Sequence, residues 1–198
     1  MADTQPGDLH ALSVKLGVSA AALMDYRWSW AAEWRSWATP MVDGEGEMVG
    51  FRLRREDGTK FSVRGGHEGI FVPWVKPQRQ AVLVEGPSDA AAAATLGFYA
   101  IGRPSCSGGL TAIIRTIRRL GIERVVVIPD DDSASESERG RNPGLAGGAL
   151  LSKHLPVPHC TLILPAKDLR SCLAAGLDAT TLDSMIKQLI WVNPERTK

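Results

Sequence analysis

The sequence predicts an α/β protein: a parallel four-stranded sheet flanked by helices, preceded by a small α+β N-terminal subdomain with a β-meander. From residue 81 onward, short apolar runs alternate with segments of helical periodicity, which is typical of a parallel sheet. Before residue 73, apolar and basic residues alternate between turn signals, as in antiparallel strands. We therefore expect two units, residues 1–79 and residues 80–198.

Composition is ordinary for a globular protein and excludes several classes. At 198 residues the chain can bury a core, and its net charge of +1 means that any affinity for nucleic acid comes from local patches. The three cysteines form no Cys-x-x-Cys pair, which argues against a disulfide framework or a zinc ribbon. The N-terminus has no signal-peptide pattern and no apolar run is long enough to cross a membrane, so we expect a cytoplasmic protein without a membrane partner.

The first forty residues predict helices and an aromatic cluster. Residues 8–25 read as two short helices, either a DNA-binding helix-turn-helix or, as we favour, a helical cap with few side chains able to read a base edge. Trp30, Trp34 and Trp37 then have helical spacing in a segment that Pro40 ends. These tryptophans could stack on nucleic-acid bases, but we expect them to pack in the core because tryptophan supplies a large apolar area.

Residues 41–73 predict the β-meander. Asp-Gly pairs at residues 43–44 and 57–58 are hairpin-turn signals. Between and after them, apolar residues alternate with cations, and a period of two places the cations on one face. The cations are Arg52, Arg54, Lys60 and Arg64. A solvated sheet face and a phosphate-binding platform explain this basic face equally well.

The second half predicts strands at residues 81–85, 98–102, 124–129 and 160–164. Helices are expected from about Ser88, which can cap the first one, and after Gly109, with two more near the C-terminus and one at about residues 145–154. Residues 133–144 are polar and predict an exposed loop.

Carboxylates follow two of these strands. Glu85 ends the first strand, and Asp130 and Asp132 follow the third. Because ligands of a parallel sheet bind beyond the carboxyl ends of its strands, we expect these acids at one edge. Converging carboxylates repel one another unless protonated or bridged by a cation, and a hard oxygen cluster favours Mg²⁺.

The two acidic segments resemble the TOPRIM domain of bacterial and phage-type DNA primases, primase-helicases, topoisomerases and some nucleases. The family pattern is a strand ending in Glu-Gly with an Asp three residues after that Gly, then a strand ending in Asp-x-Asp; here these are residues 85–89 and 130–132. The resemblance covers roughly residues 80–175 and includes Lys167-Asp168-Leu169. It implies that Glu85, Asp130 and Asp132 hold Mg²⁺ or Mn²⁺, with Asp89 and Asp168 as supporting acids.

The resemblance also implies an activity. A primase-like nucleotidyltransferase would make RNA primers from NTPs on single-stranded DNA, in replication of a phage, plasmid or mobile element. The chain carries no zinc-binding module and no Gly-x-x-x-x-Gly-Lys-Ser/Thr helicase motif, so a helicase or template-binding partner protein is expected. A TOPRIM metal-dependent nuclease and a non-catalytic nucleic-acid-binding module remain as alternatives.

Overall fold

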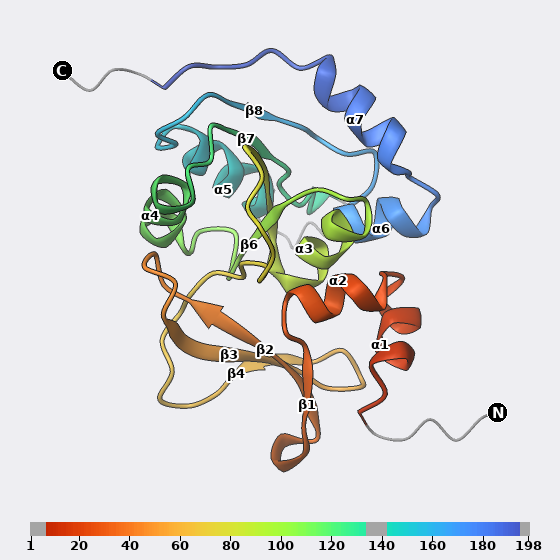
Figure 1. The fold of residues 1–198 in the computed structure, drawn as a ribbon. Helices are drawn as coiled ribbons and strands as arrows, with labels where there is room; N and C mark the ends of the chain where they lie inside the picture. Colours follow the sequence, from red (N-terminus) through yellow and green to blue (C-terminus); the bar gives the residue numbers. More distant parts are fainter. Residues whose placement is uncertain (1–6, 134–141, 195–198) are drawn as a thin grey trace.

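The computed structural model describes residues 7–133 and 142–194. An antiparallel sheet from the N-terminal part lies next to a parallel sheet from the rest of the chain (Figure 1). In chain order the elements are α1 (Leu9–Leu16), α2 (Ala20–Asp25), β1 (Ser29–Ala31), the 3₁₀ turn η1 (Ala32–Trp34), β2 (Ser36–Val42), β3 (Met48–Arg54), β4 (Lys60–Ser62), β5 (Gln80–Glu85), α3 (Gly86–Thr95), β6 (Ala100–Arg103), α4 (Leu110–Leu120), β7 (Arg124–Val127), α5 (Pro143–Ser152), β8 (His159–Thr161), α6 (Leu169–Ala174) and α7 (Ala179–Lys187). None of the helices in the two described ranges has the length and apolar character that a membrane crossing needs.

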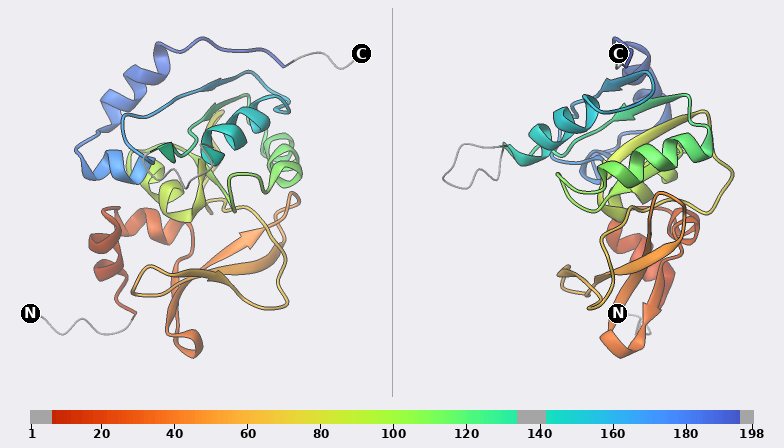
Figure 2. Two further views of the ribbon diagram at one scale, coloured as in Figure 1. Left: turned by 180° about the vertical axis from the view of Figure 1, so that it is seen from behind. Right: turned by 90° about the vertical axis from the view of Figure 1, so that its left-hand side faces the viewer.

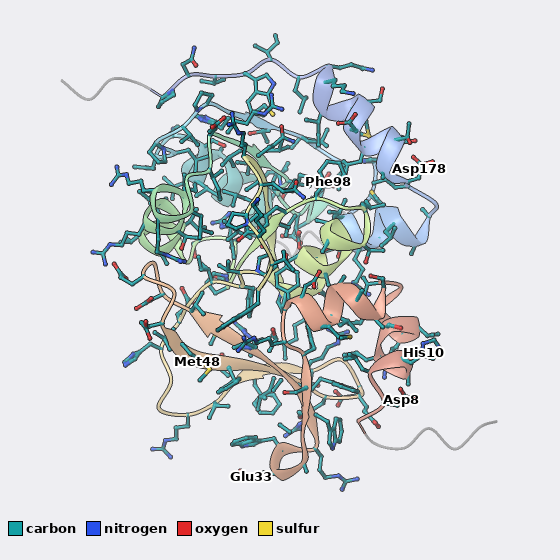
Figure 3. All side chains as sticks on the ribbon, viewed as in Figure 1. Asp8, His10, Glu33, Met48, Phe98 and Asp178 are labelled. Atoms are coloured by element: carbon teal, nitrogen blue, oxygen red, sulfur yellow. The ribbon has the colours of Figure 1, made fainter. Side chains whose placement is uncertain are left out.

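The two N-terminal helices form a cap on the core. Asp8 stands at the start of α1, where its side chain accepts a hydrogen bond from the His10 backbone N–H, and Asp178 has the same role at α7 (Figure 3). Apolar side chains of α1 and α2, among them Leu16 and Leu23, are buried in a core that they share with α3. The buried side of α2 is therefore occupied by packing.

The tryptophan segment does not form the α-helix that its spacing predicts, and only a single 3₁₀ turn, η1, lies in it. β1, η1 and β2 form a hairpin, in keeping with the preference of aromatic residues for strands. Trp28 and Trp37 are core residues, each 6% exposed, and the Trp30 ring lies edge-on to Trp37 with centroids 5.5 Å apart. Trp34 is 41% exposed, so the expectation of core packing is wrong for this residue.

The antiparallel sheet has the order β1-β2-β3-β4, with tight turns at both predicted Asp-Gly pairs. Cross-strand partners share a face, so the register places Trp37, Arg54 and Lys60 in one transverse row. Arg52 pairs with Ser62 on the same face. β4 ends at Ser62, and Arg64 lies exposed in the turn that follows.

The parallel sheet has the order β6-β5-β7-β8, with helices on both faces (Figure 2). Alternate side chains of its central strands point into two cores. Val82 and Val126 pack on the side of α3, α6 and α7, whereas Leu83 and Val127 pack on the side of α4 and α5. The four strands lie close to the predicted positions, and the predicted fold class is confirmed.

The junction between β5 and α3 differs from the prediction. The helix begins at Gly86, directly after the strand, and its N-cap residue Glu85 makes no side-chain capping bond. Gly86 has φ +72°, a conformation that favours glycine and permits this abrupt turn. Ser88, expected to cap the helix, is instead buried within its first turn. Most of the predicted loop at residues 133–144 lies outside the described residues, and its end already belongs to α5.

Candidate functional site

A polar cleft of about 390 Å³ lies at the carboxyl ends of the parallel strands, where the antiparallel sheet meets them. It is lined by Arg52, Lys60, Glu85, Gly86, Pro87, Ser88, Asp89, Pro104, Ser105, Asp130, Lys167, Asp168, Arg170 and Ser171. The acids come from the end of β5, the segment after β7 and the starts of α3 and α6, and two of the cations come from the antiparallel sheet. The cleft therefore brings opposite charges from distant segments together.

Glu85 and Asp130 occupy neighbouring strand ends because β5 and β7 pair directly. Burial raises the pKa of Glu85, an effect that the nearby Arg103 opposes and Asp132 reinforces. The pKa of Asp130 rises to about 8, first through burial and then through the charges of Asp89 and Glu85. These carboxylates are thus close enough to repel one another, as their strand-end positions predicted.

The two acids that follow Asp130 have different surroundings. Asp132 forms an ion pair with Lys167 at 3.2 Å, and this contact raises the pKa of the lysine. Asp131 accepts hydrogen bonds from the Asn142 side chain at 2.6 Å and from the Ser133 backbone at 2.9 Å. Asp131 is therefore engaged with the loop, whereas Asp132 faces a cation that also lines the cleft.

Asp89 and Asp168 are both tied to the start of α6. Asp168 is its N-cap and accepts a hydrogen bond from the Ser171 backbone N–H at 2.7 Å. Asp89, in the first turn of α3, accepts one from the Arg170 backbone N–H at 2.9 Å. Both are buried, and burial together with the charge of Asp168 raises the pKa of Asp89 to about 6. These two acids organise the wall of the cleft.

Three of the four predicted cations of the basic face lie toward the acids. Lys60 lines the cleft, and burial followed by the charge of Arg54 lowers its pKa. Burial followed by the charge of Arg170 lowers the pKa of Arg54. The Arg52 guanidinium donates to the Pro104 carbonyl at 3.1 Å. The fourth cation, Arg64, lies beyond the end of β4 and is exposed.

Sequence reasoning missed two arginines. Arg170 lines the cleft from α6, and Arg103 pairs in register with Glu85 and is 4% exposed. The Arg103 guanidinium donates to the Cys106 carbonyl, while its Nε has no hydrogen-bond partner among the described residues. Arg103 could have been found from the sequence, because a charged residue at the end of a strand that is otherwise apolar needs a partner. Nothing local marks Arg170.

The donor set suits a hard divalent cation, although the side chains do not form a ready-made cage. Within residues 7–133 and 142–194, no three His, Cys, Asp or Glu side chains are close enough to form a metal cluster. Yet Glu85 Oε1 is buried without a hydrogen-bond partner in the described part of the chain, and the charge of Glu85 raises the pKa of Asp130. A divalent cation bound by carboxylate oxygens would give Glu85 Oε1 a partner and reduce the repulsion between Glu85 and Asp130. These residues therefore fit Mg²⁺ or Mn²⁺.

Comparison with known proteins identifies the fold. No protein-family model matches the sequence, and no curated protein matches it. Among solved structures, a DnaG primase catalytic domain bound to ssDNA has a TM-score of 0.69 and 13% identity, covering 96% of this chain and 74% of that chain. The E. coli primase catalytic core has a TM-score of 0.68 and 15% identity, covering 92% and 73%.

The primase fragment of the bacteriophage T7 primase-helicase protein is also similar, with a TM-score of 0.63 and 16% identity over 87% of this chain and 72% of that one. These matches include the antiparallel sheet as well as the parallel one, since they cover most of the chain. The chain therefore has the TOPRIM-containing fold of primase catalytic cores.

Proposed function

We propose that this protein is a primase-like nucleotidyltransferase that uses Mg²⁺ or Mn²⁺ to join NTPs on single-stranded DNA. The observation that carries the proposal is the cleft itself, in which strand-end carboxylates and the basic face of the antiparallel sheet line one space. Phosphoryl transfer depends mainly on positioning and charge neutralisation, and this arrangement offers both.

In this proposal Glu85, Asp130 and Asp132 hold the metal, with Asp89 and Asp168 supporting them. A bound divalent ion lowers the pKa of an attacking hydroxyl and neutralises charge on the phosphate. The chain's own acids orient that ion, and their raised pKa values identify groups whose charge calls for a counterion.

The cations bind the phosphates. Arg52 and Lys60 line the cleft from one sheet face, and Arg170 lines it from α6. Arg54 lies on the same sheet face, opposite Lys60 in the register. Guanidinium groups suit phosphate because their planar donors bind two oxygens at once. Arg103 acts on Glu85 as a positioning residue, because its buried charge favours the ionised carboxylate that a metal needs.

Partners follow from the same chemistry. A template must be supplied as single-stranded DNA, and one similar primase structure holds ssDNA. A helicase or a template-binding protein would provide such a strand, and one similar fragment comes from a primase-helicase. We propose replication of a phage, plasmid or mobile element as the setting.

The decisive experiment offers single-stranded DNA, NTPs and either metal to the purified protein and measures labelled oligonucleotides. Glu85→Gln and Asp130→Asn each remove a ligand and are expected to abolish synthesis. Asp131→Asn is the matched control, because this carboxylate is engaged with Asn142 and Ser133 instead, and its synthesis should persist.

Other outcomes identify other functions. Metal-dependent cleavage of DNA without NTPs, lost in Glu85→Gln, would contradict the primase proposal and indicate a nuclease. Salt-sensitive DNA binding without metal affinity in calorimetry would indicate a non-catalytic module.

A further inference from the structure

A second pocket lies outside the cleft, at the end of the antiparallel sheet. Its volume is about 580 Å³. It is lined by Trp30, Trp34, Arg35, Arg55, Glu56 and Asp57. Two indole rings and two guanidinium groups line this one pocket. Packing against the core explains Trp30 but not Trp34, whose ring is 41% exposed.

The hairpin of β1, η1 and β2 presents these rings in fixed positions. The Trp30 ring is held edge-on against Trp37, which belongs to the core. Ser36 is fully buried, and its hydroxyl donates a hydrogen bond to the Trp34 carbonyl at 2.8 Å. Arg35 has φ +43°, a left-handed conformation that residues other than glycine rarely adopt. The exposed Trp34 thus stands on an anchored backbone.

The register of the sheet connects this pocket to the cleft. Trp30 pairs with Trp37, Trp37 with Arg54, and Arg54 with Lys60, so all four lie in one row on one face. Adjacent strands are about 4.8 Å apart, so the row from β1 to β4 spans ~14 Å. Lys60 lines the cleft at one end of the row, and Trp30 lines the second pocket at the other.

The chemistry of the pocket favours a flat ring over a phosphate. Arg35 and Arg55 are matched in number by Glu56 and Asp57, so the lining offers no net positive charge. Asp57 is held by the Thr59 backbone N–H at 2.8 Å and remains beside the pocket. What remains attractive is aromatic surface, on which any nucleobase can stack without sequence preference.

We propose that an unpaired base of single-stranded DNA stacks on Trp34 in this pocket while the phosphates of the same strand follow Arg54 and Lys60 toward the cleft. The inference rests on the proposed function, because it needs a strand in the cleft. The proposed contact lies outside the catalytic cleft. It would keep the DNA strand bound to the protein while the reaction takes place in the cleft.

The test measures binding of a labelled single-stranded oligonucleotide to the full chain by fluorescence anisotropy. Trp34→Ala removes the ring and is expected to weaken binding roughly 5- to 150-fold, whereas Trp34→Phe keeps a stacking surface and should lose less. Trp74→Ala is the matched control, since Trp74 is 52% exposed in a different pocket under the Arg27 guanidinium.

A second substrate isolates stacking. An oligonucleotide with abasic sites should bind wild-type protein and Trp34→Ala equally, and the salt dependence of binding should be unchanged in Trp34→Ala because no phosphate contact is lost. Normal binding of ordinary DNA by Trp34→Ala would overturn the inference and point to a protein partner for this ring, while leaving the proposed function intact. Failure of wild-type protein to bind single-stranded DNA at low salt would overturn both.

Discussion

The carboxylate of Asp89 accepts a hydrogen bond from the backbone N–H of Arg170 at 2.9 Å, although 81 positions separate them in the chain. The bond joins the first turn of α3 to the first turn of α6. It holds the backbone of Arg170 at the edge of the cleft that its side chain lines. An acid in the family motif thus positions a cation that the motif does not contain.

This bond predicts different effects for two substitutions of Asp89. Asp89→Ala leaves the part-buried Arg170 N–H without this acceptor and should lower the free energy of unfolding by about 1–3 kcal/mol. Asp89→Asn keeps an acceptor oxygen and removes a charge that burial disfavours, so its stability should stay near that of the wild type. Urea denaturation of the metal-free protein measures both, and equal losses would show that the hydrogen bond contributes little.

The raised pKa of Asp130 predicts how stability depends on pH. Its folded value of about 8 exceeds the unfolded value of about 3.9, so the stability gained from its protonation is present below pH ~4 and lost as the pH rises toward 8. Asp130→Asn should therefore raise the Tm of metal-free protein by a few degrees at pH 8, since about 1 kcal/mol shifts Tm by about 2–4 °C at this size. The difference from wild type should disappear near pH 4, and a difference that grows toward low pH would contradict the assignment.

The affinity for metal should increase with pH, whereas the stability of the metal-free protein should decrease. A cation binds the ionised carboxylates and competes with protons, so the apparent Mg²⁺ affinity should rise as the pH increases through about 8, the pKa of Asp130. Calorimetry across this range measures the effect. An affinity that stays flat from pH 6 to pH 9 would argue that Asp130 is not a ligand.

The basic face predicts unequal roles for two cations that the sequence placed together. Lys60→Ala removes a charge that lines the cleft and should reduce the slope of log K against log salt by about 0.7 for single-stranded DNA. Arg64→Ala, beyond the end of β4, should leave the slope unchanged. Titrations of single-stranded DNA at several salt concentrations compare the two variants. An equally reduced slope in both would show that Arg64 also contacts phosphate.

Close packing of α5 predicts a steric effect. A Cβ at Gly147 would collide with the Cys106 carbonyl, in the loop that leads to α4. Gly147→Ala should therefore lower the free energy of unfolding by about 1–3 kcal/mol despite alanine's better helix propensity. Ala149→Leu, on the exposed side of the same helix, is the control and should be nearly neutral. A stabilised Gly147→Ala protein would show that the loop can move aside.

The sequence determined the features that depend on local pattern. Apolar runs placed the four parallel strands, because a buried strand needs consecutive apolar side chains whatever surrounds it. The period of two placed Arg52, Arg54 and Lys60 on one face for the same kind of reason. The sequence also predicted that the strand-end acids lie close together, because the carboxyl ends of neighbouring parallel strands meet at one edge of a sheet.

Tertiary structure alone decided which faces meet. Periodicity says that a face is polar or apolar and carries no information about the element opposite, so the pairing of the basic face with the acidic edge, the contact of Asp89 with α6 and the presence of Arg170 in the cleft came from long-range packing. The tryptophan hairpin shows the same limit, since helical spacing there was overridden by strand pairing. Local sequence determines the secondary structure and the polar or apolar faces of each segment. The packing of distant segments decides which residues those faces contact.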